Sequence, residues 1–120
     1  METSLHKQKL ETEQVQQPQH ISVLERLEKW GEDRNFYNKE HGTTPEKQML
    51  KLQEEIGELA SDLAKGRDPK DSIGDAGVVL VGLAKLCGTS LLACLEIAYN
   101  EIKNRKGEMR NGIFVKQEDL

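Results

Sequence analysis

The order of apolar and polar residues predicts helices along most of this chain. Between residues 21 and 38, apolar residues recur three and four positions apart, with charged residues on the other side. We therefore expect a first helix within Ile21 to Asn38, and Gly42 then interrupts the chain. The apolar residues of this segment are Val23, Leu24, Leu27 and Trp30.

A second helix is expected from about Pro45 to Lys65. Thr43 and Thr44 offer an N-cap, Pro45 fits the first turn, and Gly66 ends the helix. Apolar residues three and four apart draw a single stripe along it. That stripe consists of Met49, Leu52, Ile56, Leu59 and Leu63.

Two further helices are expected, from about Pro69 to Leu86 and from about Ser90 to Asn104, with a Gly88-Thr89 turn between them. The segment GVVLVGL within the third is compatible with a strand, but its length and its helical flanks favour a helix. The fourth has apolar residues at helical spacing. The fold class is therefore all-α, with four antiparallel helices in a bundle.

Composition modifies this picture in two ways. Only 36% of the 120 residues are hydrophobic and 4% are aromatic, which is lean for a monomer of this size. We therefore expect an oligomer, a homodimer or a homotetramer. Residues 1–19 are rich in Gln, Glu and Lys, which predicts a flexible polar arm ahead of a helical domain over residues 20–120.

Charge and hydropathy exclude some classes of protein. The net charge of -4 argues against broad binding of nucleic-acid polymers. The N-terminal residues lack the apolar core of a signal peptide, and the longest apolar run, Ala76 to Ala84, is too short to span a bilayer. A cytoplasmic protein without membrane contact is expected, with Cys87 and Cys94 as buried thiols in a reducing compartment.

Four carboxylates carry the most specific chemistry. Glu55 and Glu58 share one face of the second helix, beside the apolar stripe, and Glu54 lies one turn from Glu58. Asp75 leads into the uncharged run of the third helix, where a carboxylate is costly unless a cation or hydrogen bonds compensate it. Convergent carboxylates without histidine suit a hard ion, Mg²⁺ or Mn²⁺. The alternatives are a solvated acidic face and, for Asp75, pairing with the helix dipole, a role that Asp71 fills better.

Basic and aromatic residues form a second set. Asn100 and Lys103 lie on one polar stripe of the fourth helix, and Arg105 and Lys106 follow it. Lys103 and Arg105 have the alternative role of compensating the helix dipole. Trp30 has two interpretations, a core residue or a surface for base stacking.

In their order, these residues resemble the MazG-like nucleotide pyrophosphohydrolases of the all-alpha NTP pyrophosphatase superfamily. The resemblance runs from about Val23 to Asp119. It rests on the family's EExxE, here Glu54-Glu55-x-x-Glu58, and on the acidic motif of the next helix, which ends in Asp75. The late segment AYNEIKNRKGEMRNGIFVK looks like that of small stand-alone and phage-type members.

The resemblance implies Mg²⁺-dependent cleavage of a ribo- or deoxyribonucleoside triphosphate to the monophosphate and pyrophosphate. It implies metal ligands at Glu55, Glu58 and Asp75, with Asp71 as a further candidate. Glu54 would be another ligand or would orient the attacking water, and Glu54 and Glu55 are the catalytic candidates. The residues implied to bind substrate are Asn100, Lys103, Arg105, Lys106 and Trp30.

One position departs from the family pattern. The second motif is usually ExxD, and the residue three before Asp75 is Ser72. The adjacent Asp71 offers a carboxylate, but a shift of one residue turns a helical side chain by about 100°. The number of metal ions and the presence of full activity therefore stay open at this point.

Two other functional classes remain open. The chain could bind a nucleotide or an alarmone without hydrolysing it, which Mg²⁺-dependent binding without product would reveal. It could also be a helical interaction module whose acidic face binds a basic partner, independently of metal and with an affinity that falls as salt rises. Phosphoribosyl-ATP pyrophosphohydrolase is a lesser enzymatic alternative within the same superfamily.

Overall fold

The computed structural model describes residues 22–120, so the flexible arm expected over residues 1–19 lies outside the described residues. The described chain is mostly helical, with one small two-stranded sheet, and the four expected helices are present. In chain order the elements are α2 (Val23–Asp33), the 3-10 turn η1 (Lys39–His41), α3 (Pro45–Ala64), α4 (Lys70–Leu86), α5 (Leu91–Ile102), β1 (Gly107–Arg110), β2 (Ile113–Lys116) and the 3-10 turn η2 (Gln117–Asp119).

Side-chain caps fix the start of three of the helices. The hydroxyl of Ser22 accepts a hydrogen bond from the backbone N–H of Glu25 at the start of α2. Thr44 caps α3 in the same way, with Pro45 in the first turn, and Ser90 caps α5. Such caps satisfy N–H groups that have no partner within the helix. The starts of α3 and α5 were predictable for this reason.

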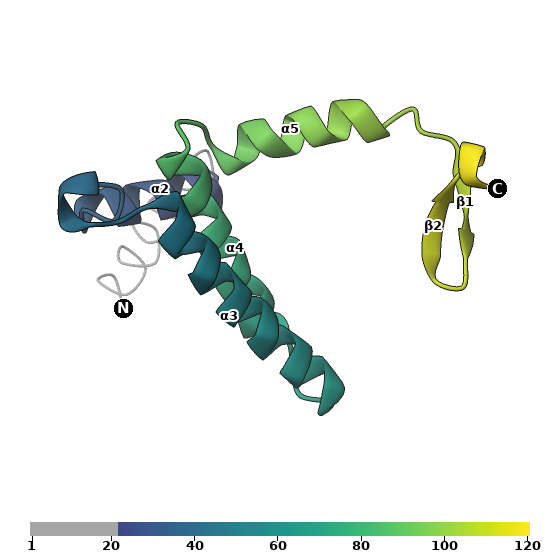
Figure 1. The fold of residues 1–120 in the computed structure, drawn as a ribbon, viewed down its shortest axis with the longest axis horizontal. Helices are drawn as coiled ribbons and strands as arrows, with labels where there is room; N and C mark the ends of the chain where they lie inside the picture. The colour runs from purple at the N-terminus through teal and green to yellow at the C-terminus, as the bar shows by residue number, and fades with distance from the viewer. Residues whose placement is uncertain (1–21) are drawn as a thin grey trace, which may run out of the picture.

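Helices α3 and α4 lie side by side and are joined by a short loop (Figure 1). Gly66 takes a left-handed conformation in that loop, with φ of 67°. Leu52 of α3 packs against Ala76 and Val79 of α4 in a small buried core. Helix α2 packs across α4. The acidic residues of α3 and α4 are thereby brought to a common interface.

Helix α5 turns away from this body, at 97° to α4 (Figure 1). None of its residues is buried. The radius of gyration is 19.3 Å, whereas a compact domain of this length has about 14 Å. Residues 22–120 of one chain therefore do not form a closed bundle of four antiparallel helices.

The two cysteines depart from the sequence prediction. Cys87 follows the last residue of α4 and Cys94 lies on α5, and both are exposed. The prediction of buried thiols was wrong for the single chain, because Cys87 lies in the exposed turn after α4 and no residue of α5 is buried.

The C-terminal segment forms a hairpin that the helix pattern did not predict. Strands β1 and β2 pair antiparallel, with Arg110 opposite Ile113. Asn111 and Gly112 connect them with φ of 52° and 80°. Positive φ at both central residues is the geometry that Asn-Gly favours in two-residue hairpins.

No single helix within residues 22–120 has both the length and the apolar content needed to cross a bilayer. Helices α4 and α5 meet that criterion only when counted together, across their 97° bend.

Candidate metal centre and adjoining pocket

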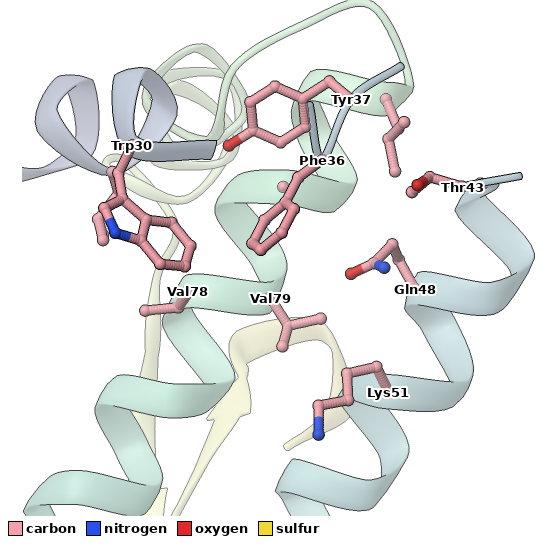
Figure 2. A pocket seen from close by; sticks show the side chains of 11 residues that line it. Trp30, Phe36, Tyr37, Thr43, Gln48, Lys51, Val78 and Val79 are labelled. Atoms are coloured by element: carbon pink, nitrogen blue, oxygen red, sulfur yellow. The ribbon is translucent and has the colours of Figure 1, made fainter. Parts of the chain in front are cut away.

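An aromatic pocket of about 370 Å³ lies between α2, α3 and α4 (Figure 2). Trp30 and Phe36 form one wall, with ring centroids 5.0 Å apart and ring planes at 79°. Val78 and Val79 of α4 form the floor. The polar residues at its α3 side are Thr43, Gln48 and Lys51.

The wall of this pocket depends on a close approach between Gly31 and Tyr37. Gly31 is buried, and a Cβ atom built on it would overlap the phenol ring and hydroxyl of Tyr37. Burial raises the pKa of Tyr37, and the charges of Glu28 and Glu32 raise it further. Tyr37 is therefore held as a neutral phenol against α2.

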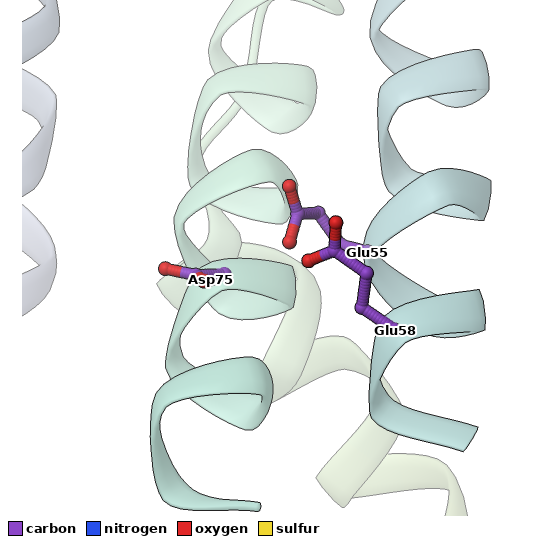
Figure 3. Close-up of side chains that lie close together, drawn as sticks. All are labelled: Glu55, Glu58 and Asp75. Carbon is purple, nitrogen blue, oxygen red and sulfur yellow. The ribbon is translucent and has the colours of Figure 1, made fainter. Parts of the chain in front are cut away.

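Three carboxylates lie close together at the α3–α4 pair. In the view of Figure 3, those of Glu55 and Glu58 point toward α4, whereas that of Asp75 points away from α3. Glu55 and Glu58 come from α3 and Asp75 comes from α4. Each offers one oxygen, and these oxygens lie within 4.8 Å of one another. Glu55 is buried, Asp75 is half-buried and Glu58 is exposed. We call these three residues the carboxylate triad.

Glu55 has one oxygen paired and one unpaired. Its Oε1 lies 3.2 Å from the Nζ of Lys51, one turn earlier on α3. The whole residue is only 6% exposed. Its Oε2 is buried and has no hydrogen-bond partner among the described residues. A buried carboxylate oxygen without a partner is costly unless a ligand or an ion compensates it.

Crowding of negative charge alters the other two members of the triad. The charge of Glu55 raises the pKa of Glu58 most, followed by desolvation and by the hydrogen bond that the two carboxyl groups share when Glu58 is protonated. Desolvation raises the pKa of Asp75, followed by the charges of Asp71 and Glu55. Lys51 opposes both shifts. A bound cation would relieve the same repulsion.

Two of the predicted acids lie beside the triad and outside it. Glu54 is exposed, and its Oε1 is 3.6 Å from the Nζ of Lys51. Asp71 is exposed one turn before Asp75, close enough to raise the pKa of Asp75. The structure brings together Glu55, Glu58 and Asp75, and it adds neither Asp71 nor Glu54 to them.

Ser72, three residues before Asp75, is buried at the same helix pair. Its hydroxyl donates a hydrogen bond to Oδ2 of Asp62 on α3. Asp62 also accepts a hydrogen bond of 2.9 Å from the Nε of Arg67. The hydrogen bond from Ser72, followed by that from Arg67, lowers the pKa of Asp62 despite partial desolvation.

The predicted substrate-binding residues fall into two places. Trp30 lines the pocket. The other four are exposed at the far end of α5 and in the segment after it, and within one chain the structure does not bring them to the triad (Figure 1). They are Asn100, Lys103, Arg105 and Lys106.

Lys51 is the site residue that the sequence prediction missed. It lines the pocket and also pairs with Glu54 and Glu55, so it connects the pocket with the triad. The signal was present in the sequence. A lysine three and four residues before two glutamates on a helix shares their face.

Comparison with known proteins gives one partial relative and no assignment. A search against protein-family models finds no match, and no solved structure matches the chain. The chain is 49% identical over 65 residues to an uncharacterized 18.2 kDa protein from the rep-hol intergenic region of Haemophilus phage HP1. The match covers 52% of this chain and 38% of the phage protein, so it spans well under half of that relative's length.

Proposed function

We propose that this chain is a cytoplasmic, Mg²⁺-dependent nucleoside triphosphate pyrophosphohydrolase, with Mn²⁺ as an alternative ion. The observation that carries the proposal is the unpartnered, buried Oε2 of Glu55 within a triad of carboxylates. A solvated acidic face would leave its oxygens in water. A buried oxygen beside two other carboxylates instead favours a cation ligand.

The donor set fits a hard divalent ion. Glu55, Glu58 and Asp75 supply only carboxylate oxygens, and Mg²⁺ prefers oxygen ligands while keeping several waters. A bound Mg²⁺ would offset the phosphate charge and lower the pKa of a coordinated water. Glu54 is exposed beside the triad, where a carboxylate can orient or deprotonate the attacking water.

The pocket supports a nucleotide as the substrate. Its volume and its aromatic wall suit one planar heteroaromatic ring, stacked on Trp30 or Phe36. Lys51 lies at the edge of the pocket toward the triad. A nucleotide with its base in the pocket and its phosphates at the triad would lie alongside Lys51. The ammonium group of Lys51 would then pair with a phosphate oxygen.

The proposal includes a homodimer or a homotetramer. Part of the apolar stripe of α3 is exposed, namely Met49, Ile56 and Leu63. These residues recur every seven positions, the spacing of helices that pack against a partner helix. A second copy of the α3–α4 pair would cover this face and complete four helices. It would also offer the basic residues after α5 to the triad of its partner, where they would stabilise charge on the leaving pyrophosphate.

The test is release of pyrophosphate with Mg²⁺ from a panel of canonical, deoxy and damaged nucleoside triphosphates. Loss of an ion ligand in Glu58→Gln or Asp75→Asn is expected to lower turnover at least about a hundredfold, since changes outside the ligand shell alone cost up to about that much. Glu46→Gln is the matched control, an exposed glutamate in the first turn of α3. Undiminished turnover in both triad variants would overturn the assignment.

A second candidate is a protein that binds a nucleotide or an alarmone without hydrolysing it. The observation that favours it is Ser72, whose hydroxyl is engaged by Asp62 and supplies no carboxylate. Isothermal titration would separate the two functions. Mg²⁺-dependent binding of a nucleotide, with no monophosphate or pyrophosphate found by chromatography, would support the binding protein.

A further inference from the structure

We infer that Ser72 and Asp62 are positioning residues, which hold α3 and α4 at the separation that the carboxylate triad needs to bind its ion. This inference rests on the proposed metal site. Neither residue would touch the ion or the substrate; both would act through the spacing of the two helices.

The contact belongs to a small hydrogen-bond network at the end of the α3–α4 pair where the loop joins the two helices. Ser72 is only 7% exposed, and its hydroxyl donates to Oδ2 of Asp62. The second oxygen of Asp62 accepts from the Nε of Arg67 at 2.9 Å. Arg67 lies in the loop between the helices and also donates to Ser61 at 3.1 Å. The network therefore ties α3, the loop and α4 together.

Its place along the helices links it to the triad. Asp62 lies one turn after Glu58 on α3, and Ser72 lies one turn before Asp75 on α4. Residues three and four apart share a face of a helix. The network and the triad therefore occupy the same interface, one turn apart.

The buried apolar core supports the triad on the side away from the loop between α3 and α4. The buried core consists of Leu52, one turn before Glu55, Ala76, directly after Asp75, and Val79, one turn after Asp75. On the loop side, Leu63 and Ile73 are mostly exposed. The triad thus lies between an apolar contact and a polar one. Without the polar contact, only the short loop over residues 65–69 restrains the spacing of α3 and α4 at that end, and a covalent link alone does not fix the distance between the helix faces.

Ion binding is sensitive to such a separation. Mg²⁺ requires ligands at about 2.0–2.1 Å in near-ideal octahedral geometry. A binding constellation has to be held within about 0.5 Å by its supporting residues. Because Glu58 and Asp75 come from different helices, the spacing of those helices sets the distance between their oxygens.

The experiment measures Mn²⁺ affinity by electron paramagnetic resonance of the free ion, on the full chain without nucleotide. We expect Ser72→Ala to bind Mn²⁺ about tenfold more weakly than the wild type, the size of effect typical of supporting residues. Ser72→Thr keeps the hydroxyl and is expected to bind Mn²⁺ with the affinity of the wild type. Asp62→Asn loses the charged partner of Arg67 and is expected to weaken binding as well.

The control is Thr44→Ala, which removes the N-cap of α3 at the opposite end of that helix. It is expected to lower the thermal midpoint and leave Mn²⁺ affinity unchanged. Unchanged affinity in both Ser72→Ala and Asp62→Asn would overturn the inference while leaving the metal site in place. Absence of Mn²⁺ binding in the wild type would overturn the proposed function, and the inference with it. If Ser72→Ala does not fold, the comparison of Asp62→Asn with Ser72→Thr still decides the question.

Discussion

Lys51 and Glu55 form an ion pair on α3 that engages only one oxygen of the carboxylate. The Nζ of Lys51 lies 3.2 Å from Oε1, and Oε2 stays buried without a partner among residues 22–120. The lysine is half-exposed, whereas the glutamate side chain is 9% exposed. The pair therefore offsets part of the cost of burying Glu55 and leaves a site for one more positive charge.

The substitution Lys51→Met should destabilise the protein when no divalent ion is present. It leaves both oxygens of Glu55 without a partner, which typically costs about 1–3 kcal/mol. In millimolar Mn²⁺ the loss should be smaller because the ion compensates the same carboxylate. Urea unfolding with and without Mn²⁺ measures both values.

Lys70→Met is the control for that experiment, since Lys70 is highly exposed and lies 4.0 Å from its nearest carboxylate. It should change stability little under either condition. An equal loss for Lys51→Met with and without Mn²⁺ would contradict a shared role of the lysine and the ion at Glu55.

Divalent ions should stabilise the wild-type fold. An ion present at a hundred times its dissociation constant adds about 2.7 kcal/mol to the free energy of unfolding, which corresponds to a rise of roughly 10 °C in the thermal midpoint. Asp75→Asn and Glu55→Gln should lose this rise, and a chelator should reverse it in the wild type. A wild-type midpoint that does not respond to Mg²⁺ or Mn²⁺ would speak against the triad as an ion site.

The hydrogen bonds to Asp62 predict a specific dependence of stability on pH. They lower its pKa in the folded protein below the ordinary value of 3.8. A carboxyl group with a lowered pKa stabilises the fold fully above the unfolded value and loses this contribution as the pH falls through the folded value. Unfolding by urea between pH 7 and pH 2 should therefore show a decline below about pH 3.8 that is shallower in Asp62→Asn. Identical declines in the two proteins would contradict the role of Asp62.

The exposed stripe of α3 predicts that assembly depends on Ile56. A charge at this position places an unpaired carboxylate in the proposed contact between copies, which is strongly unfavourable. Ile56→Glu should therefore shift the protein toward the monomer in size-exclusion chromatography with light scattering. Leu50→Glu makes the same chemical change on another face of α3 and should leave the assembly intact. A wild-type monomer at high concentration would contradict the proposed oligomer.

The bounds of α3 were predictable because its signals are local. Thr44 and Pro45 start the helix and Gly66 follows its end, so Pro45–Ala64 differs from the expected range by one residue. The convergence of Glu55 and Glu58 also follows from helical spacing alone. The position of Asp75 is notable from the sequence alone, because a carboxylate before an uncharged run is costly without a partner.

Other features depend on how separate elements meet. The contact of Ser72 with Asp62 depends on how α4 is rotated about its own axis relative to α3. The spacing of residues along a single helix does not predict that rotation. The direction of α5 is set by the turn at Gly88, where φ is 80°. The hairpin was a different case, since Asn111 and Gly112 are a strong local signal for it.

The close approach of Gly31 to Tyr37 has a consequence for how sequences related to this one diverge. A side chain at position 31 and a large aromatic ring at position 37 exclude each other sterically. The two positions should therefore change together, with a smaller residue at 37 wherever 31 is not glycine. Paired changes of this kind in related sequences would show that the contact between positions 31 and 37 is maintained by selection.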